Sequence, residues 1–239
     1  MSQRPHHKTA ALIESCATAF NVDVGEHDQD KWSAGLTIAK ALDTLVDEDH
    51  NYNTEAYTQQ LLRGDDVPHL TPAEQVFVRN TYHGLSPETQ HRWQGIAKDL
   101  GAFALKRLEA TTVDTYAAVV LDESQLMGNV LTVENTRARP DAQQRDAFNT
   151  WMSQMARTAY MVDTLSDIVR DYNEGNTRVR PTFHTAVRLA QHSLAELTVF
   201  TRITPAPIYS AIGKRAVTKT LEKLAAPNFL REQFIRARD

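Results

Sequence analysis

The stretch ALDTLVDED, residues 41–49, groups four carboxylates at the end of a predicted helix. Asp43 and Asp47 are four residues apart and therefore lie on one helix face, with Glu48 and Asp49 adjoining them. Like charges at this spacing repel by roughly a few tenths of a kcal/mol, and the C-terminal end of a helix disfavours anions. This local cost suggests a site that holds a positive group. The alternative is a solvated acidic helix end, which is the commoner interpretation of one cluster alone.

A second stretch, MVDTLSDIVRDYNEG, repeats the pattern near the end of the longest predicted helix. Asp163, Asp167 and Asp171 are spaced at four residues, and Glu174 follows. Two such clusters on separate helices are better explained by cations that bridge them than by chance. Oxygen ligands at this density suit Mg²⁺, which keeps water ligands and shares its shell with substrate phosphates. Neither cluster contains histidine or cysteine, which argues against zinc.

Basic residues flank both clusters. Lys40 precedes the first cluster, Arg170 lies inside the second, and Arg178 and Arg180 follow it. Arginine forks match phosphate oxygens bidentately, while lysine acts as a point charge. Carboxylates and basic groups together predict a site for magnesium and a diphosphate.

The composition limits the classes of protein to which the chain can belong. Its 239 residues, 41% hydrophobic and 23% charged, predict one soluble globular domain over residues 1–239. The net charge of −4 argues against a nucleic-acid partner. The absence of a long apolar run and of an apolar leader in MSQRPHHKTAAL predicts a cytoplasmic location. The single cysteine, Cys16, is expected to be structural and buried.

The elements that must position these residues are predicted to be helices. Apolar residues recur at spacings of three and four, and no stretch alternates long enough to form a sheet. Thr71-Pro72-Ala73-Glu74 and Ser86-Pro87 are typical helix starts, while Gly175 indicates a helix stop. The fold class is therefore predicted to be all-α, with helices near 7–20, 30–49, 54–63, 72–83, 87–109, 112–132, 141–173, 182–199, 207–225 and 228–237.

The two acidic motifs resemble those of a known family. ALDTLVDE, residues 41–48, is similar to the first aspartate-rich motif of the squalene and phytoene synthases, which reads like ALDTxxDD. DIVRDYNEG, residues 167–175, resembles the second motif, NIIRDYxED, and TRVRP resembles the arginine-rich stretch that follows it. LSPETQHRWQGIAKDLGAFALKRL and TYAAVVLDESQLMGNVL resemble the helices between the motifs, so the similarity covers residues of about 33–225.

This resemblance implies a single helical bundle of the isoprenoid synthase type with a central cavity. Two acidic helices would face each other across its mouth, with Mg²⁺ ions bridging them to substrate diphosphates. The implied metal ligands are Asp43, Asp47, Glu48, Asp163, Asp167, Asp171 and Glu174. The implied diphosphate contacts are Lys40, Arg170, Tyr172, Arg178 and Arg180. The implied catalytic residues are Asp43, Asp47, Asp167 and Asp171, together with Tyr116 as an aromatic group for a carbocation.

Three departures from the family pattern bear on the site. Asp167 stands where the family has asparagine, and Gly175 stands where a last carboxylate is expected. Asp163, one turn earlier, is the candidate for the missing ligand. Asp122 and Glu123 stand in a central segment that is small and apolar in the family.

The implied function is a Mg²⁺-dependent prenyl transferase that condenses two isoprenyl diphosphates, C15 or C20, head to head into a squalene- or phytoene-like product. Because the chain is short for the family, a terpene synthase that ionises one prenyl diphosphate is the second hypothesis. A non-catalytic binding or assembly module is the third. An apolar product would bring the protein to a membrane surface, and no dinucleotide motif predicts a need for NADPH. The sequence does not distinguish prenyl chain lengths or oligomeric states.

Overall fold

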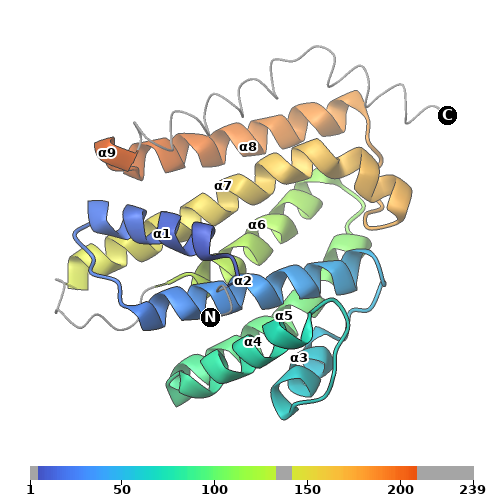
Figure 1. The fold of residues 1–239 in the computed structure, drawn as a ribbon. Helices are drawn as coiled ribbons and strands as arrows, with labels where there is room; N and C mark the ends of the chain where they lie inside the picture. The colour runs from blue at the N-terminus through green and yellow to red at the C-terminus, as the bar shows by residue number, and fades with distance from the viewer. Residues whose placement is uncertain (1–4, 133–141, 209–239) are drawn as a thin grey trace. The chain divides into compact units, whose positions relative to one another are not determined.

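The computed structural model describes residues 5–132 and 142–208 of the chain. Within these ranges the regular structure consists of α-helices and includes no strand, so the prediction of an all-α fold is confirmed. The isoprenoid synthase type and its central cavity stay predictions. The helices, shown in Figure 1, are α1 (His7–Ala19), α2 (Glu26–Asp47), α3 (Thr54–Arg63), α4 (Pro72–Gly84), α5 (Pro87–Glu109), α6 (Val113–Val130), α7 (Ala142–Glu174), α8 (Phe183–Ile203) and α9 (Ala206–Ile208).

Most predicted helix limits agree with the structure within two residues. The largest differences are four residues each, and one of them is at the start of α2, which begins at Glu26 rather than near residue 30. Glu26 and Asp28 occupy its first turn, where the helix dipole favours acidic groups. Helix α8 continues to Ile203, four residues past its predicted end. The predicted helix 207–225 is described only as far as Ile208, and the one at 228–237 lies outside the described residues.

Side-chain caps define two helix starts as predicted. At α4, the Thr71 hydroxyl accepts from the Glu74 N–H at 3.3 Å, and a Glu74 carboxylate oxygen accepts from the Thr71 N–H at 2.9 Å. This reciprocal pair is the capping box that the sequence indicated. At α5, the Ser86 hydroxyl accepts from the Thr89 N–H at 3.2 Å, and Pro87 is the first helical residue.

The chain divides into two compact units. One comprises Met1–Ala104 with Asn129–Thr150, and the other comprises Leu105–Gly128 with Trp151–Asp239. Helices α5, α6 and α7 each contribute residues to both units. The single-domain organisation of the whole chain stays a prediction. The first acidic cluster belongs to the first unit and the second cluster to the second unit.

In the first unit, α2 packs against α1, α3 and α4. Its inner face buries Trp32 completely. Gly35 allows the end of α6 to approach closely, because a Cβ at this position would clash with Val130. The buried Lys31 ammonium donates to the carbonyl oxygen of Thr132 at 2.6 Å, which ties α2 to the residues that follow α6. These contacts fix the place of α2 within the first unit, and the acidic cluster lies at the end of that helix.

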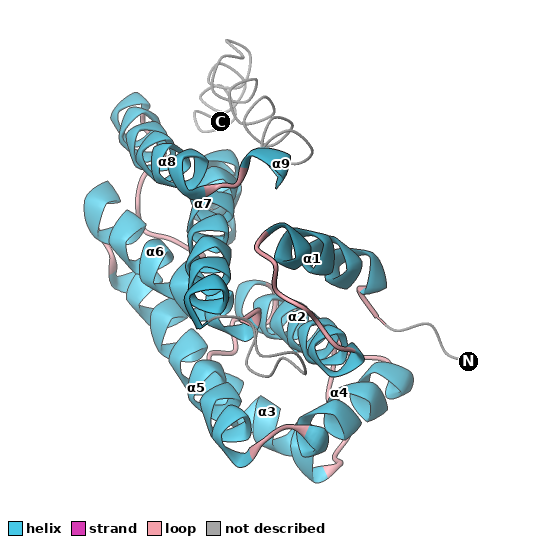
Figure 2. Ribbon diagram, turned by 90° about the vertical axis from the view of Figure 1, so that its left-hand side faces the viewer, coloured by secondary structure: helices cyan, strands magenta, loops and turns pink. Residues whose placement is uncertain are grey.

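In the second unit, α7 and α8 run antiparallel and side by side, as Figures 1 and 2 show. The Arg157 guanidinium and the Gln154 amide both donate to the Glu196 carboxylate, at 2.7–3.0 Å. Further along, the Ser193 hydroxyl donates to the Met161 carbonyl oxygen at 3.0 Å, and the Trp151 ring lies against Phe200. The second acidic cluster lies at the end of α7 near residue 174, beyond these contacts. Among the helices of the described residues, none is both long and apolar enough to cross a bilayer.

Candidate functional site

The first acidic cluster lies on the outer side of the last turns of α2. Leu42, Leu45 and Val46 are buried in the core of the first unit, whereas Asp43 is exposed and Asp47 is half-buried. The helical period therefore separates an apolar inner face from a carboxylate outer face. Asp43 and Asp47 both have further polar or electrostatic contacts. The predicted position of the cluster, at the C-terminal end of a helix, is confirmed.

Asp49, just beyond α2, contacts a residue that is distant in sequence. Its carboxylate lies 2.6 Å from the Nε2 atom of His69, in the connection between α3 and α4. Burial, together with the negative charge of Asp49, raises the pKa of the Tyr57 hydroxyl to about 12, and that hydroxyl donates to the Pro68 carbonyl oxygen. His69 is 20 residues from Asp49, so no local spacing in the sequence predicts this contact. Asp49 helps to fix the α3–α4 connection against the end of α2.

Lys40, the predicted diphosphate contact on α2, is exposed and lies near the start of α4. The hydrogen bond that Glu74 accepts from the Thr71 N–H is the main cause that lowers the pKa of Glu74. The positive charge of Lys40 lowers this pKa further. The ammonium group is thus within electrostatic reach of an exposed carboxylate. A diphosphate bound there would compete with Glu74 for Lys40.

The second acidic cluster surrounds an arginine on its own helix. The Arg170 guanidinium lies 3.0 Å from Asp167, 3.6 Å from Asp171 and 3.7 Å from Glu174. The side chain of Asp171 is only 14% exposed, while that of Arg170 is 59% exposed. Asp163, one turn before this group, is exposed. Three predicted metal ligands therefore contact Arg170, which the sequence analysis predicted to be a diphosphate contact.

Gly175 ends α7, and this role explains why the position is occupied by glycine. Its φ of 83° lies in the left-handed region, its N–H donates to Tyr172, and the Asn176 N–H donates to Asp171 at 2.7 Å. These two bonds form a Schellman cap, which glycine adopts without steric strain. An aspartate or glutamate here would stand in a strained conformation. The helix stop was predicted, and it explains the missing carboxylate of the second motif.

The connection from α7 to α8 presents its arginines outward. Arg178 and Arg180 are exposed, while Val179 between them is buried and its N–H donates to the Thr177 hydroxyl. Tyr172 is also exposed, at 39%. The alternation anchors the connection through Val179 and leaves both guanidinium groups at the surface. The arginines therefore follow the acidic cluster closely in the chain and lie in the same unit.

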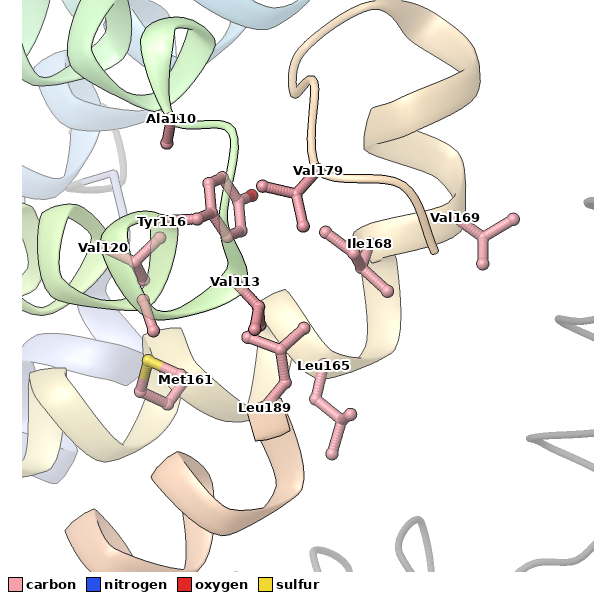
Figure 3. Packing of buried hydrophobic residues seen from close by; sticks show 11 residues of the cluster. Ala110, Val113, Tyr116, Val120, Met161, Leu165, Ile168, Val169, Val179 and Leu189 are labelled. Atoms are coloured by element: carbon pink, nitrogen blue, oxygen red, sulfur yellow. The ribbon is translucent and has the colours of Figure 1, made fainter. Parts of the chain in front are cut away.

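Tyr116, the predicted aromatic group for a carbocation, is part of the core of the second unit. It is 1% exposed and belongs to a cluster with Val120, Met161 and Val179, shown in Figure 3. The cluster also contains Ile168 and Val169, which form the inner face of α7 beneath Asp167 and Arg170. The structure therefore places Tyr116 in the packing that supports the acidic turns of α7.

The acidic residues of the central segment have different surroundings. The Glu123 carboxylate is buried on α6 and lies 3.3 Å from the guanidinium of Arg107 on α5, with both side chains largely shielded from solvent. Asp122 is exposed. The hydrogen bond from Arg157 to Glu196 is the largest cause that raises the pKa of Arg157 on α7, and the negative charge of Asp122 helps to raise it. Sequence reasoning missed Arg107 and Arg157, because their partners lie on other helices.

The donor chemistry of both clusters suits Mg²⁺, although neither is a complete site of protein ligands. Within residues 5–132 and 142–208, no three histidine, cysteine or acidic residues come together closely enough to hold a metal ion. Magnesium normally uses only one or two carboxylates and completes its shell with waters and phosphates. On α7, Asp167 and Asp171 contact one nitrogen of the Arg170 guanidinium and Glu174 contacts another, at 3.0–3.7 Å.

Comparison of the chain with models of protein families, with curated proteins and with solved structures finds no match.

Proposed function

We propose that this chain is a Mg²⁺-dependent prenyl transferase that condenses two isoprenyl diphosphates head to head into a squalene- or phytoene-like product. The observation that carries the proposal is the pair of carboxylate clusters at the C-terminal ends of α2 and α7. The two clusters and their order along the chain resemble the two acidic motifs of the squalene and phytoene synthases. The proposal includes that the two clusters face each other across a cavity.

The α2 and α7 carboxylates would hold the metal. Asp43, Asp47 and Glu48 are the donors on one helix, and Asp163, Asp167, Asp171 and Glu174 are those on the other. Bound Mg²⁺ supplies positive charge that neutralises the departing diphosphate. Arg170 lies 3.0–3.7 Å from Asp167, Asp171 and Glu174 and offsets part of their negative charge. In this proposal the acidic groups act as metal ligands and not as an acid–base pair.

The basic side chains would bind the diphosphate itself. Arg178 and Arg180 are exposed directly after the α7 cluster, so their guanidinium forks can reach phosphate oxygens without loss of core packing. Lys40 supplies a point charge beside the α2 cluster, and the Tyr172 hydroxyl supplies a donor beside Asp171. These groups orient the diphosphate and balance its charge.

A second candidate, the ionisation of a single prenyl diphosphate, is favoured by the buried Arg107–Glu123 pair. Glu123 puts a charged side chain, 10% exposed, into a segment that is small and apolar in the family, and its partner Arg107 on α5 is 16% exposed. Polar volume inside the central helices leaves less apolar room for two prenyl chains. A cyclised or hydroxylated monomeric product would be the result.

The test is incubation of the full chain with Mg²⁺ and C10, C15 or C20 prenyl diphosphates, with measurement of diphosphate release and products. A dimeric hydrocarbon supports the head-to-head reaction, and a monomeric terpene supports the second candidate. Release of diphosphate from none of these substrates would overturn both. In that case, retained cellular function of Asp43→Ala and Asp171→Ala variants would support a binding or assembly module.

A further inference from the structure

We propose that the outer face of α8, together with the α7–α8 connection, docks on an anionic lipid surface. This proposal does not require the prenyl chemistry, because it rests on exposed apolar side chains of α8 and on exposed arginines, of which Arg178 and Arg180 are also the proposed diphosphate contacts.

The apolar part of this surface is a stripe on α8. Phe183 is 67% exposed, Leu194 is 51% exposed and Val187 is 37% exposed. Their spacings of four and seven residues place them on one helix face over about 17 Å. The other large exposed hydrophobic residues among those described are Leu12 on α1, Val76 on α4, Leu105 on α5, Tyr172 on α7 and Val199, which lies on a different face of α8. Single exposed apolar residues are ordinary, whereas an aligned stripe marks a contact surface.

The stripe is not needed for the internal packing of α8. The opposite face buries Leu189, Leu197 and Phe200, and the Ser193 hydroxyl donates to α7. A surface helix normally carries polar residues on its outer side. Helix α8 instead has an apolar inner face that packs on the second unit and an apolar stripe facing outward.

Residues 175–203, which include the stripe, have a positive net charge although Arg188 is paired with Asp114 on α6 and the whole chain has a net charge of −4. Residues 175–203 contain four arginines and a single acidic residue, Glu196, whose carboxylate binds Arg157 and Gln154. Arg178, Arg180 and Arg202 are exposed. A helix with outward apolar residues and surrounding arginines has the chemistry of an interfacial membrane helix. Each exposed arginine is expected to strengthen binding to anionic lipid by about fivefold at low ionic strength.

The same positive charge argues against a second copy of the chain and against the chain's own residues 209–239 as the occupant of this surface. A second copy of the chain would bring arginines against arginines across the stripe. The chain's own residues 209–239 contain seven lysines and arginines against three acidic residues, so they also carry like charge. Nucleic acid would leave the apolar side chains without a partner. An anionic bilayer satisfies the arginines and the stripe together.

The test is co-sedimentation of the full chain with phosphatidylcholine vesicles, with and without phosphatidylglycerol, in EDTA and without prenyl substrate. The wild type should bind only the anionic vesicles, and binding should weaken as salt rises. The double variant F183S/L194S should lose binding at least about tenfold. Leu12→Ser is the matched control, because Leu12 is 47% exposed on α1, and it should bind like the wild type.

A second readout uses Phe183→Trp in the folded chain. Trp32, Trp93 and Trp151 are buried, so the new indole is the environment-sensitive fluorophore. Its emission should shift to the blue on anionic vesicles and be quenched by brominated lipid. The proposal is overturned by absence of vesicle binding, by equal losses in L12S and F183S/L194S, or by a dimer that F183S/L194S disperses without any vesicle binding. Because no substrate or metal is present, these results are distinct from failure of the proposed reaction.

Discussion

The carboxylate clusters at the ends of α2 and α7 are alike in sequence, yet they have different partners. On α7, Arg170 lies within 3.7 Å of Asp167, Asp171 and Glu174, so the helix supplies its own positive charge. On α2, Asp49 instead contacts His69, which is 20 residues away. The α7 cluster therefore contacts a positive group on its own helix, whereas Asp49 of the α2 cluster contacts a residue of the α3–α4 connection.

The two helix ends also differ in backbone. Helix α7 ends at Gly175 with a Schellman cap, whereas α2 is followed by His50 with a φ of 50°. A non-glycine residue in the left-handed region carries a cost of about 1 kcal/mol. The end of α7 is thus conformationally relaxed, and the end of α2 holds some backbone strain beside its carboxylates. The following predictions test whether the two ends are equivalent in function.

The largest expected effect is on diphosphate release. Asp43→Asn on α2 and Asp171→Asn on α7 should each lower kcat by at least about 100-fold, because a metal ligand is lost from either side. The matched control is Asp146→Asn, on the same helix as Asp171, whose side chain is 71% exposed. An effect of only one of the two substitutions would break the equivalence of the clusters. Thermal unfolding of each variant checks that the fold is kept.

A smaller effect concerns the ion pair between Arg157 on α7 and Glu196 on α8, which is better shielded from solvent than the ion pairs of Arg170. Burial raises the pKa of Glu196, but hydrogen bonds from Arg157 and Gln154 outweigh it, so the net direction is down. Glu196→Gln should therefore lower the free energy of unfolding by about 1–2 kcal/mol at pH 7.

The pH dependence of this pair follows from the same shift. A lowered carboxyl pKa contributes stability above the unfolded value of about 4.3, and this is lost as the pH falls through the folded pKa. Urea unfolding should therefore show the gap between wild type and Glu196→Gln closing below about pH 4. An equal gap at pH 7 and pH 3 would contradict this account.

The backbone comparison predicts opposite signs at the two helix ends. Gly175→Ala should destabilise the chain by about 1 kcal/mol, because alanine is strained at a φ of 83°. His50→Gly should stabilise it by about 0.5 kcal/mol, because glycine relieves the strain at the end of α2. Chemical unfolding measures both, and a loss of stability in His50→Gly would show that its side chain matters more than its backbone.

The smallest expected effect comes from Arg170→Gln. Because Arg170 is 59% exposed, its ion pairs are screened, and their loss should lower stability by about 0.5 kcal/mol at low salt. The informative measurement is the rise in Tm on adding Mg²⁺, which should be larger in Arg170→Gln than in the wild type. Arg92→Gln, which removes an i,i+4 pair on α5, is the control. Equal Mg²⁺ shifts in all three proteins would count against a cation site on α7.

The sequence alone was enough to predict the fold class and most helix limits. The capping box at Thr71, the start at Pro87 and the stop at Gly175 depend on hydrogen bonds between residues a few positions apart. The position of both acidic clusters in the last turns of α2 and α7 follows from the same local period. Metal binding, prenyl substrate and the facing of the two clusters stay predictions.

Only the tertiary structure decided which partner each charged or aromatic side chain has. Tyr116 lies in the core of the second unit, and Glu123 lies against Arg107. Glu196 binds Arg157 from a distance of 39 residues. Helical spacing determines which face of a helix a residue occupies, but the neighbour of that face depends on how separate helices pack. The packing is set by the fit of many apolar side chains, which no local pattern specifies.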